Sequence, residues 1–460
     1  MELDILAAQT NDLGTLPIKK LLLRLAAPAI LAQLINVLYN IVDRIYIGNM
    51  QGIGHLALTG VGLTFPIITL ISAFAAMIGM GGAPLMSMSL GEKNMVRAQK
   101  ILSTCMAALI VLAVVLTAVF MIWKRPFLFA FGASGDTISY ADEYISIYLL
   151  GSVFVMISLG LNSFITAQGF SKMGMLTVLI GAAANIVLDP IFIFVFQLGV
   201  RGAAIATVIS QGISAAWVLL FLFGKKATVK LRRKTFQFEW KVLLSVVALG
   251  ISPFIMQSTE SLVMIVLNSQ LQRYGNDYYV GAMTIISSVS QITMMPLMGL
   301  AQGAQPIISY NYGAGQLGRV RQGYRLLIRV CVIYATILWL SCMLIPQIFI
   351  RIFNSDPQLV STAVPALRIQ MGMIFAMGVQ NSCQQSFLAL GQAKISVFLA
   401  LLRKVILLIP LALIFPLFMG VNGVFYAQPV ADILAATSTA ICFALFCKKH
   451  LHKQEETSAE

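Results

Sequence analysis

Long apolar segments dominate this chain and restrict it to very few folds. Each reaches or exceeds the length of about 20 residues that an α-helix needs to cross the hydrocarbon core of a bilayer. They lie near residues 21–47, 56–86, 98–122, 138–166, 173–196, 201–223, 242–269, 279–308, 323–345, 359–389, 395–418 and 421–446. Hydrophobic residues make up 59% of the chain and charged residues only 10%, a balance that soluble domains do not have. The sequence therefore predicts an all-α membrane protein with about twelve transmembrane helices.

The placement of the basic residues predicts how these spans are oriented. The 31 Lys and Arg residues contribute to a net charge of +14, and most of them lie at the chain ends and in alternate connections. Short loops rich in Lys and Arg stay in the cytoplasm. We therefore expect a multi-pass protein of the cell inner (plasma) membrane with both termini in the cytoplasm. The positive charge is thus a signal of orientation rather than of nucleic-acid binding.

The two halves of the chain repeat each other. LGVRG at 198–202 resembles MGVNG at 419–423, and Lys172 recurs in an equivalent place as Lys394. An even number of spans in each half makes the halves parallel repeats, so a binding site is expected between them near the midplane. The expected domains are an N-lobe with the first six spans (1–224), a cytoplasmic linker (225–241), a C-lobe with the last six spans (242–447) and a cytoplasmic tail (448–460).

Two of the apolar segments carry polar stripes that cannot face lipid. Asp43 lies in the first segment, and Asn36 and Asn40 share its helical face. Asn185 and Asp189 repeat this i, i+4 pattern in the fifth segment. An Asp in the middle of a bilayer costs about 3 kcal/mol. We therefore expect the two stripes to meet each other or to line a cavity.

The two carboxylates indicate a cation site. Pro190 follows Asp189 and has no backbone N–H, so it leaves a carbonyl of the helix free. Two carboxylates, Asn side chains and a free carbonyl can hold a proton, or a hard cation through oxygen ligands. Carboxylates crowded in a low dielectric resist ionising together, which suits proton exchange. The alternative is a polar clamp between helices, and the cost of two intramembrane acids favours the functional interpretation.

A further acid, Glu260, lies within the seventh segment. Met256 and Met264 flank it, and Gln257 and Asn268 extend its polar face. Methionines beside a lone acid suit a hydrophobic cationic substrate. A salt bridge from Glu260 to an internal base is an equal alternative.

The last intramembrane acid, Asp432, is expected to pair with a base. Arg403 and Lys404 in the eleventh segment lie at a similar depth, because a helix rises by about 1.5 Å per residue. The sequence therefore predicts an ion pair between Asp432 and one of these two bases. A structural or gating role is favoured over substrate binding.

Motifs for enzymatic chemistry are poorly represented. GAGQLG at 313–318 fits a dinucleotide-binding fingerprint, but it follows an apolar helix rather than a strand. No Walker motif occurs, and His55, His450 and His452 lie at segment ends without forming a metal site. We expect no enzymatic activity, no catalytic residues and no cofactor, with H+ or Na+ as a coupling ion.

The chain resembles the multidrug and toxic compound extrusion (MATE) family over essentially its whole length. The resemblance is carried by NVLYNIVDRIYIG at 36–48, NIVLDPIFIF at 185–194 and GVRGAAIAT at 199–207. It fits the bacterial branch of MepA-like and DinF-like exporters. The resemblance implies a V-shaped fold of two six-helix bundles that exports organic cations in exchange for H+ or Na+.

The resemblance also implies roles for individual residues. Cation coupling, or metal ligation if the ion is Na+, is implied for Asp43, Asn185, Asp189 and Thr207. Pro28 corresponds to the mobile proline of the first helix, and Pro190 is the second proline with an expected conformational role. Gln384 and Gln385 stand where another branch has an acid of a second-half sodium site, so the N-lobe cluster is the better candidate.

We therefore predict a twelve-helix secondary transporter that works by alternating access. Cation binding in the N-lobe would favour one facing and displace an organic substrate. Its partners are the lipid bilayer and small organic cations, with no nucleic acid, and the protein is expected to be a monomer. The main alternative is an exporter or flippase of an amphipathic lipid-linked molecule or a metabolite. A passive channel and a membrane-embedded transferase fit the sequence less well.

Overall fold

The computed structural model describes residues 12–50, 54–232, 237–353 and 357–452. Within these ranges the chain forms helices and no β-strand. Ten helices are long and apolar enough to cross a membrane, and two bent helix pairs bring the total to twelve spans. The predicted all-α membrane fold is therefore confirmed.

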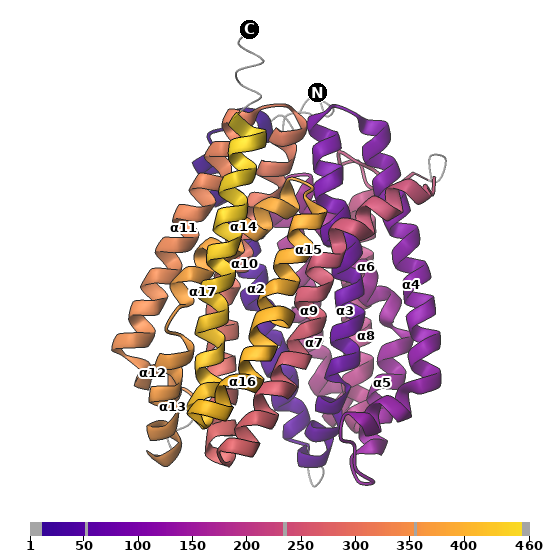
Figure 1. Cartoon of the computed structure of the whole chain (residues 1–460). Coiled ribbons are helices and arrows are strands. Elements are labelled where there is room, and N and C mark those ends of the chain that lie inside the picture. Colours follow the sequence, from indigo (N-terminus) through magenta and orange to yellow (C-terminus); the bar gives the residue numbers. More distant parts are fainter. Residues whose placement is uncertain (1–11, 51–53, 233–236, 354–356, 453–460) are drawn as a thin grey trace.

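The first half holds six spans and is coloured indigo to magenta in Figure 1. Two of its spans are composite: α5 continues into α6, and the π-helix η1 extends α7. The elements are α2 (Ile18–Gly48), α3 (Gly54–Gly91), α4 (Met95–Ala130), α5 (Ile138–Leu150), α6 (Ser152–Ala167), α7 (Ser171–Pro190), η1 (Ile191–Val195) and α8 (Gly199–Phe223).

The second half repeats this order, with the short helix α12 added before the bent span. The π-helix η3 interrupts the eleventh span of the chain, and the π-helix η4 ends the twelfth. The elements are α9 (Trp240–Tyr274), α10 (Asp277–Gly313), α11 (Leu317–Leu344), α12 (Pro346–Arg351), α13 (Pro357–Gln370), α14 (Ile374–Ala389), α15 (Ala393–Leu401), η3 (Leu402–Leu408), α16 (Ile409–Met419), α17 (Val421–Phe446) and η4 (Cys447–His452).

The fourth and tenth spans are both bent. Helices α5 and α6 meet at 57°, and α13 and α14 meet at 47°. The first bend falls at Gly151, where a Cβ would lie only 2.4 Å from a methyl carbon of Val208 on α8. The missing side chain lets α8 approach the bend, so this glycine is required by packing.

Several helices run past the boundaries that hydropathy predicts. Helix α4 ends at Ala130 rather than near residue 122, and α10 ends at Gly313 rather than near residue 308. A helix satisfies its own backbone hydrogen bonds, so it continues beyond the hydrocarbon into the interfacial region. Hydropathy marks only the part that lies in the hydrocarbon, which explains the difference.

The two halves meet through backbone contacts at glycines. Helix α3 packs along α9, and α2 packs along α10 (Figure 1). A Cβ on Gly250 of α9 would lie 1.9 Å from the carbonyl oxygen of Met77 on α3. A Cβ on Gly303 of α10 would lie 2.5 Å from the backbone of Ala26 on α2. Larger side chains at these glycines would force the halves apart.

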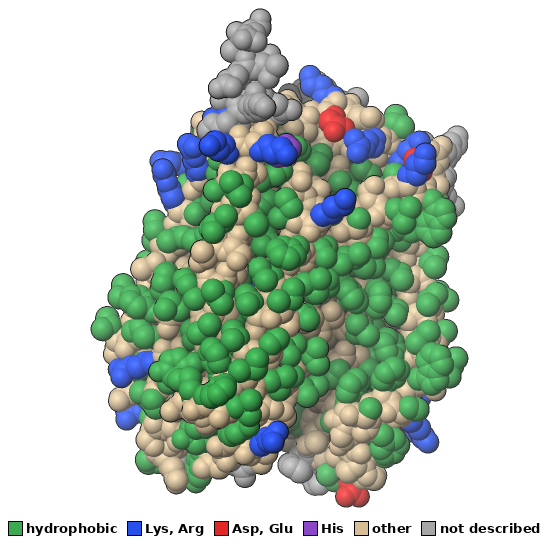
Figure 2. Space-filling model, viewed as in Figure 1, with side chains coloured by type: hydrophobic (Ala, Val, Ile, Leu, Met, Phe, Trp, Pro, Cys, Tyr) green, Lys and Arg blue, Asp and Glu red, His purple; other side chains and the backbone are tan. Residues whose placement is uncertain are grey.

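The buried apolar core is shared between the halves at one end of the molecule only. One cluster joins residues of both halves, such as Ile78 with Val246 and Ile307. A second cluster, which includes Leu267 and Phe425, is built from the second half alone. Figure 1 shows the C-terminal end of α17 at the end where the halves are joined. Figure 2 shows Lys and Arg side chains gathered there, and a notch between the halves at the opposite end.

Two pairs of side chains connect the halves at the inner edge of this joined region. The rings of Phe74 and Phe254 lie 4.8 Å apart between their centroids. The Gln33 amide donates a hydrogen bond of 3.2 Å to the amide oxygen of Gln302. Along α2 and α9, these contacts lie between the glycine contacts and the polar residues. They therefore mark the boundary of the joined region on the side of those polar residues.

The residues before α2 add a further connection at the basic end. Arg319 of α11 donates hydrogen bonds to the carbonyl oxygens of Leu13 at 3.1 Å and Leu16 at 2.7 Å. Asn311 of α10 donates to the same Leu13 carbonyl at 3.0 Å. The Leu13 side chain is buried in the shared core. The start of the first half is thus attached to the second half.

The predicted linker begins against the first half. Val229 is buried, and its backbone N–H donates a 2.8 Å hydrogen bond to the side-chain oxygen of Gln168. Residues 233–236 of this linker and residues 453–460 of the predicted tail lie outside the described residues. The division into two lobes, a linker and a tail stays a prediction.

The glycine contact between α3 and α9 makes a first prediction. Gly250→Ala should lower the free energy of unfolding by about 1–3 kcal/mol, because the new Cβ meets backbone that cannot rotate away. Gly62→Ala is the matched control, since a Cβ there meets nothing within 4 Å. Thermal unfolding of the two purified variants measures the difference. Equal stability of both variants would contradict the packing of α3 against α9.

Candidate functional site

The structure brings the polar stripes of the first half together. Asp43 lies on α2, Asn185 and Asp189 lie on α7, and Thr207 lies on α8. The Asn185 amide donates to Asp189 Oδ1 at 3.1 Å and approaches Thr207 Oγ1 at 3.5 Å. Asn185, Asp189 and Thr207 are all buried. These four residues are called the N-half cluster below.

The two carboxyl groups of the N-half cluster are neighbours. The Asp43 and Asp189 side chains interact electrostatically with each other. Two ionised carboxylates at close range repel each other and can only accept hydrogen bonds. A proton on one of the two groups, or a cation between them, would therefore stabilise the pair.

Three oxygen atoms of this cluster are buried without a hydrogen-bond partner. They are Asp43 Oδ1, Asn185 Oδ1 and Asp189 Oδ2. A buried unsatisfied polar atom costs about 1–3 kcal/mol. The described residues contain no group of three or more His, Cys, Asp and Glu side chains that could hold a metal. The cluster instead offers two carboxylates with neutral amide and hydroxyl oxygens, a set that suits a proton or a hard monovalent cation.

Local backbone features position these side chains. The fifth span does not end at Pro190 but continues as the π-helix η1, where the N–H of Phe196 donates to the carbonyl of Ile191 at 2.9 Å. Gly202 of α8 lies against this turn, since a Cβ there would be 2.6 Å from the carbonyl oxygen of Phe192. The close approach holds α8 against α7 and places Thr207 beside Asn185.

Tyrosines surround the cluster, a feature that the sequence analysis missed. Tyr39 and Tyr144 lie close to Thr207. The rings of Tyr144 and Tyr148 on α5 stack with centroids 6.3 Å apart, and both residues are buried. A buried tyrosine needs a partner for its hydroxyl. The i, i+4 spacing of Tyr144 and Tyr148 was the available signal.

The rest of the polar stripe on α2 points elsewhere. Asn40 is exposed and donates to the carbonyl of Asn36 at 2.6 Å. The guanidinium of Arg44 lies 5.8 Å from the centroid of the Phe65 ring. Pro28 is buried within α2, which continues unbroken through it. Asp43 is thus the member of the stripe that reaches the N-half cluster.

The second half holds a cluster of four charges in an equivalent place. Lys404 contacts the Glu260 carboxylate and donates to the Met256 carbonyl at 2.5 Å. Arg403 Nε donates to Asp432 Oδ1 at 2.9 Å. The base that pairs with Asp432 is therefore Arg403, and Lys404 makes the salt bridge that was one alternative for Glu260. The charges of these four side chains sum to zero.

The other residues of the Glu260 face make few contacts. The hydroxyl of Ser287 lies 3.6 Å from the sulfur of Met264, and Asn268 Oδ1 is buried without a partner. Gln257 is half-buried on the same helix. Gln384 donates to Ser396 O at 2.8 Å within a buried network of neutral groups. A neutral amide thus stands where the acid is missing; its NH2 group is hydrogen-bonded, whereas its oxygen is buried without a partner.

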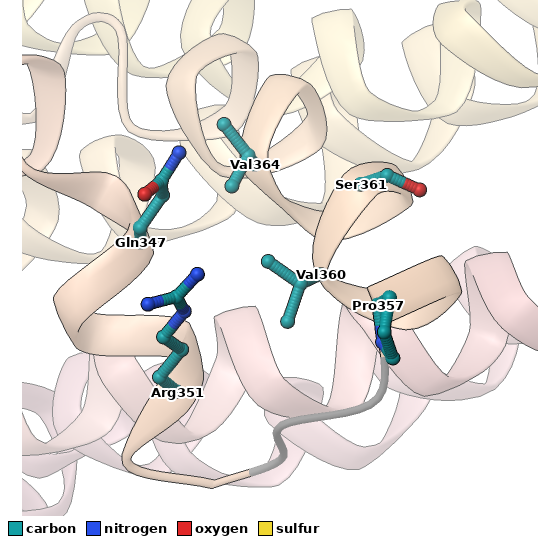
Figure 3. A pocket seen from close by; sticks show the side chains of 6 residues that line it. All are labelled: Gln347, Arg351, Pro357, Val360, Ser361 and Val364. Atoms are coloured by element: carbon teal, nitrogen blue, oxygen red, sulfur yellow. The ribbon is translucent and has the colours of Figure 1, made fainter.

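A separate pocket of about 510 Å³ lies between α12 and α13 (Figure 3). Its lining residues are Gln347, Arg351, Pro357, Val360, Ser361 and Val364. It borders residues 354–356, which the structure does not describe. It shares no residue with the two charged clusters.

Comparison with known proteins identifies the family of this chain. Residues 28–191 and 253–414 each match the MatE family, one match in each half. Multidrug export protein MepA of Staphylococcus haemolyticus (strain JCSC1435) is 26% identical over 421 residues, which cover 91% of this chain and 91% of that protein. Multidrug export protein MepA of Staphylococcus aureus (strain N315) is 25% identical over 429 residues, with coverage of 92% and 93%.

A solved structure supports the same conclusion for the fold. A crystal structure of MATE in the bent conformation superposes with a TM-score of 0.90 at 23% sequence identity. The match covers 98% of this chain and 99% of that chain. The two family matches span most of the sequence and reproduce its duplication. The chain therefore belongs to the MatE family, and is a MATE-type membrane transporter rather than an enzyme.

Proposed function

We propose that this transporter is an antiporter that exports organic, mainly hydrophobic cationic compounds in exchange for H+ or Na+. The observation that carries the proposal is the N-half cluster, where two carboxyl groups are neighbours and three buried oxygens lack hydrogen-bond partners. A site with unsatisfied acceptors gains free energy by binding a cation. The relatives named as multidrug export proteins support organic compounds as the exported substrates.

The cluster is well placed to couple cation binding to a change of facing. It joins α2, α7 and α8, and α2 also packs along α10 of the second half. A bound cation therefore acts on the helix that connects the two halves. Pro28 leaves α2 without one backbone hydrogen bond, which lowers the cost of bending it. Binding shifts the equilibrium only if the two facings differ in cation affinity.

The substrate is proposed to bind on the second-half side of the space between the halves. The residues assigned to it are Met256, Gln257, Glu260, Met264, Asn268 and, across the gap, Asn40. The Glu260 side chain is 66% exposed, so its carboxylate is accessible to a solute. Methionine thioethers adapt to ligands of different shape, which suits a broad range of organic compounds.

The proposed orientation places the joined, basic end in the cytoplasm. Lys and Arg side chains gather at this end, as short cytoplasmic loops require (Figure 2). The glycine contacts close this end. The conformation described here is then closed to the cytoplasm and open to the outside, ready to release substrate and take up the coupling cation.

The second prediction concerns Asp43. Asp43→Asn should abolish export driven by a proton or sodium gradient, because the neutral amide can neither exchange a proton nor attract a cation. The assay is uptake of ethidium into inverted vesicles with an imposed gradient. Glu143→Gln is the matched control, since it removes a carboxylate that pairs with Arg201 at the surface. Gradient-driven uptake by Asp43→Asn at the wild-type rate would contradict the proposal.

The third prediction separates the two coupling ions. Thr207→Val removes one hydroxyl oxygen but keeps the shape of the side chain and both carboxylates. If Na+ is the coupling ion, its affinity should fall by about fivefold or more, since one net hydrogen-bond-like contact is worth about 1 kcal/mol or more. If H+ is the ion, proton uptake should persist. Retained coupling to both gradients would remove Thr207 from the site.

A further inference from the structure

The pair of Glu260 and Lys404 combines an exposed acid with a buried base. The Glu260 side chain is 66% exposed, whereas the Lys404 side chain is only 9% exposed. The ammonium of Lys404 contacts the carboxylate and also donates to the carbonyl of Met256 at 2.5 Å. An ammonium group belonging to the protein thus already occupies one side of this carboxylate.

The exposed carboxylate faces inward and not toward lipid. Glu260 shares its face of α9 with Pro253, Leu267 and Leu271, which are all buried. The side chain of Ile265, on the opposite face, is 57% exposed as expected for a lipid contact. An acid that points inward and is still largely exposed must border a hollow that solutes can enter.

The π-helix η3 explains how two adjacent bases reach two different acids. It spans Leu402–Leu408 and contains both Arg403 and Lys404. Arg403 reaches Asp432 on α17, whereas Lys404 reaches Glu260 on α9. Single π-turns within α-helices occur frequently at functional sites. The turn thereby brings a second positive charge to the wall of the hollow.

The salt bridge changes the electrostatic interaction between a substrate and the protein surface beside Glu260. A lone carboxylate attracts cations and repels anions. With an ammonium in contact, the two Coulomb contributions at a nearby solute largely cancel. A cationic substrate must then displace Lys404 or accept its repulsion.

We propose that Lys404 determines the charge selectivity of substrate binding, because its ammonium competes with substrate cations for the Glu260 carboxylate. In the wild-type protein, the surface beside Glu260 and Lys404 then binds hydrophobic solutes with only a weak preference for positive charge. This inference rests on the proposed export function in one respect, namely that substrates enter the space beside Glu260. It concerns substrate affinity and needs no ion gradient.

The test compares two hydrophobic ions of nearly equal shape, tetraphenylphosphonium and tetraphenylborate. Equilibrium binding of each ion is measured on the full chain in lipid nanodiscs, with empty nanodiscs subtracted. Lys404→Met should raise the ratio of cation to anion affinity about tenfold or more, because it leaves the Glu260 charge uncompensated. Expressing the result as a ratio to wild type cancels the membrane partition of each ion.

Two double variants control the interpretation. Glu260→Gln combined with Lys404→Met removes both charges and should return the ratio to within about twofold of wild type. Arg403→Met combined with Asp432→Asn removes the neighbouring pair and should also leave the ratio unchanged.

A single variant tests that neighbouring pair by itself. Asp432→Asn should lower the thermal stability, since it leaves the partly buried Arg403 without its partner.

The inference fails if monodisperse Lys404→Met protein keeps the wild-type ratio. It also fails if the double variant of Glu260 and Lys404 shows the same shift as Lys404→Met, because the shift would then not depend on the carboxylate. Should Lys404→Met not purify as a folded protein, Lys404→Gln carries the same test. A shifted ratio in a protein without gradient-driven uptake would overturn the proposed antiport and leave the role of Lys404 standing.

Discussion

The free-energy cost of a carboxylate inside the bilayer governs the rest of this structure. Each acid within a span must be matched by a proton, a cation or a base. In the second half, Arg403 and Lys404 neutralise Asp432 and Glu260 from within the protein. In the first half, Asp43 and Asp189 are neighbours with buried oxygens that lack partners, and the proposed function has them compensated by a proton or cation from solution.

The duplication makes this difference between the halves informative. Both clusters join the first, fifth and sixth spans of their own half, so the same arrangement of helices has received two different sets of charges. A cluster whose negative charge is balanced by ions from solution can respond to the ion gradient. A cluster whose negative charge is balanced by the protein's own bases keeps its charge state. Under the proposed function, ion coupling lies in the first half and contact with substrate in the second. The contacts of α2 with α10 and of α3 with α9 connect the two.

The spans, the duplication and the main polar cluster could be predicted because each leaves a local signal in the sequence. Hydropathy marks the spans, and the i, i+4 pattern of Asn185 and Asp189 marks a face that must find a partner. Other features depend on tertiary contacts. Depth alone could not tell which base pairs with Asp432, because Arg403 and Lys404 are adjacent and lie at nearly the same depth. The sequence alone does not distinguish Tyr144 and Tyr148 from residues of the apolar core, since nothing in their segment reveals that Thr207 lies close to Tyr144.

Antiport requires that substrate and coupling cation do not occupy their favoured sites in the same facing. This can be tested by measuring the release of H+ or Na+ when tetraphenylphosphonium binds to purified protein in weakly buffered solution. A pH-sensitive dye and a sodium electrode report the two ions. We expect release of at least one of the two ions in proportion to bound substrate, and no release from the Asp43→Asn variant. Saturable substrate binding by the wild-type protein without release of either ion would contradict it.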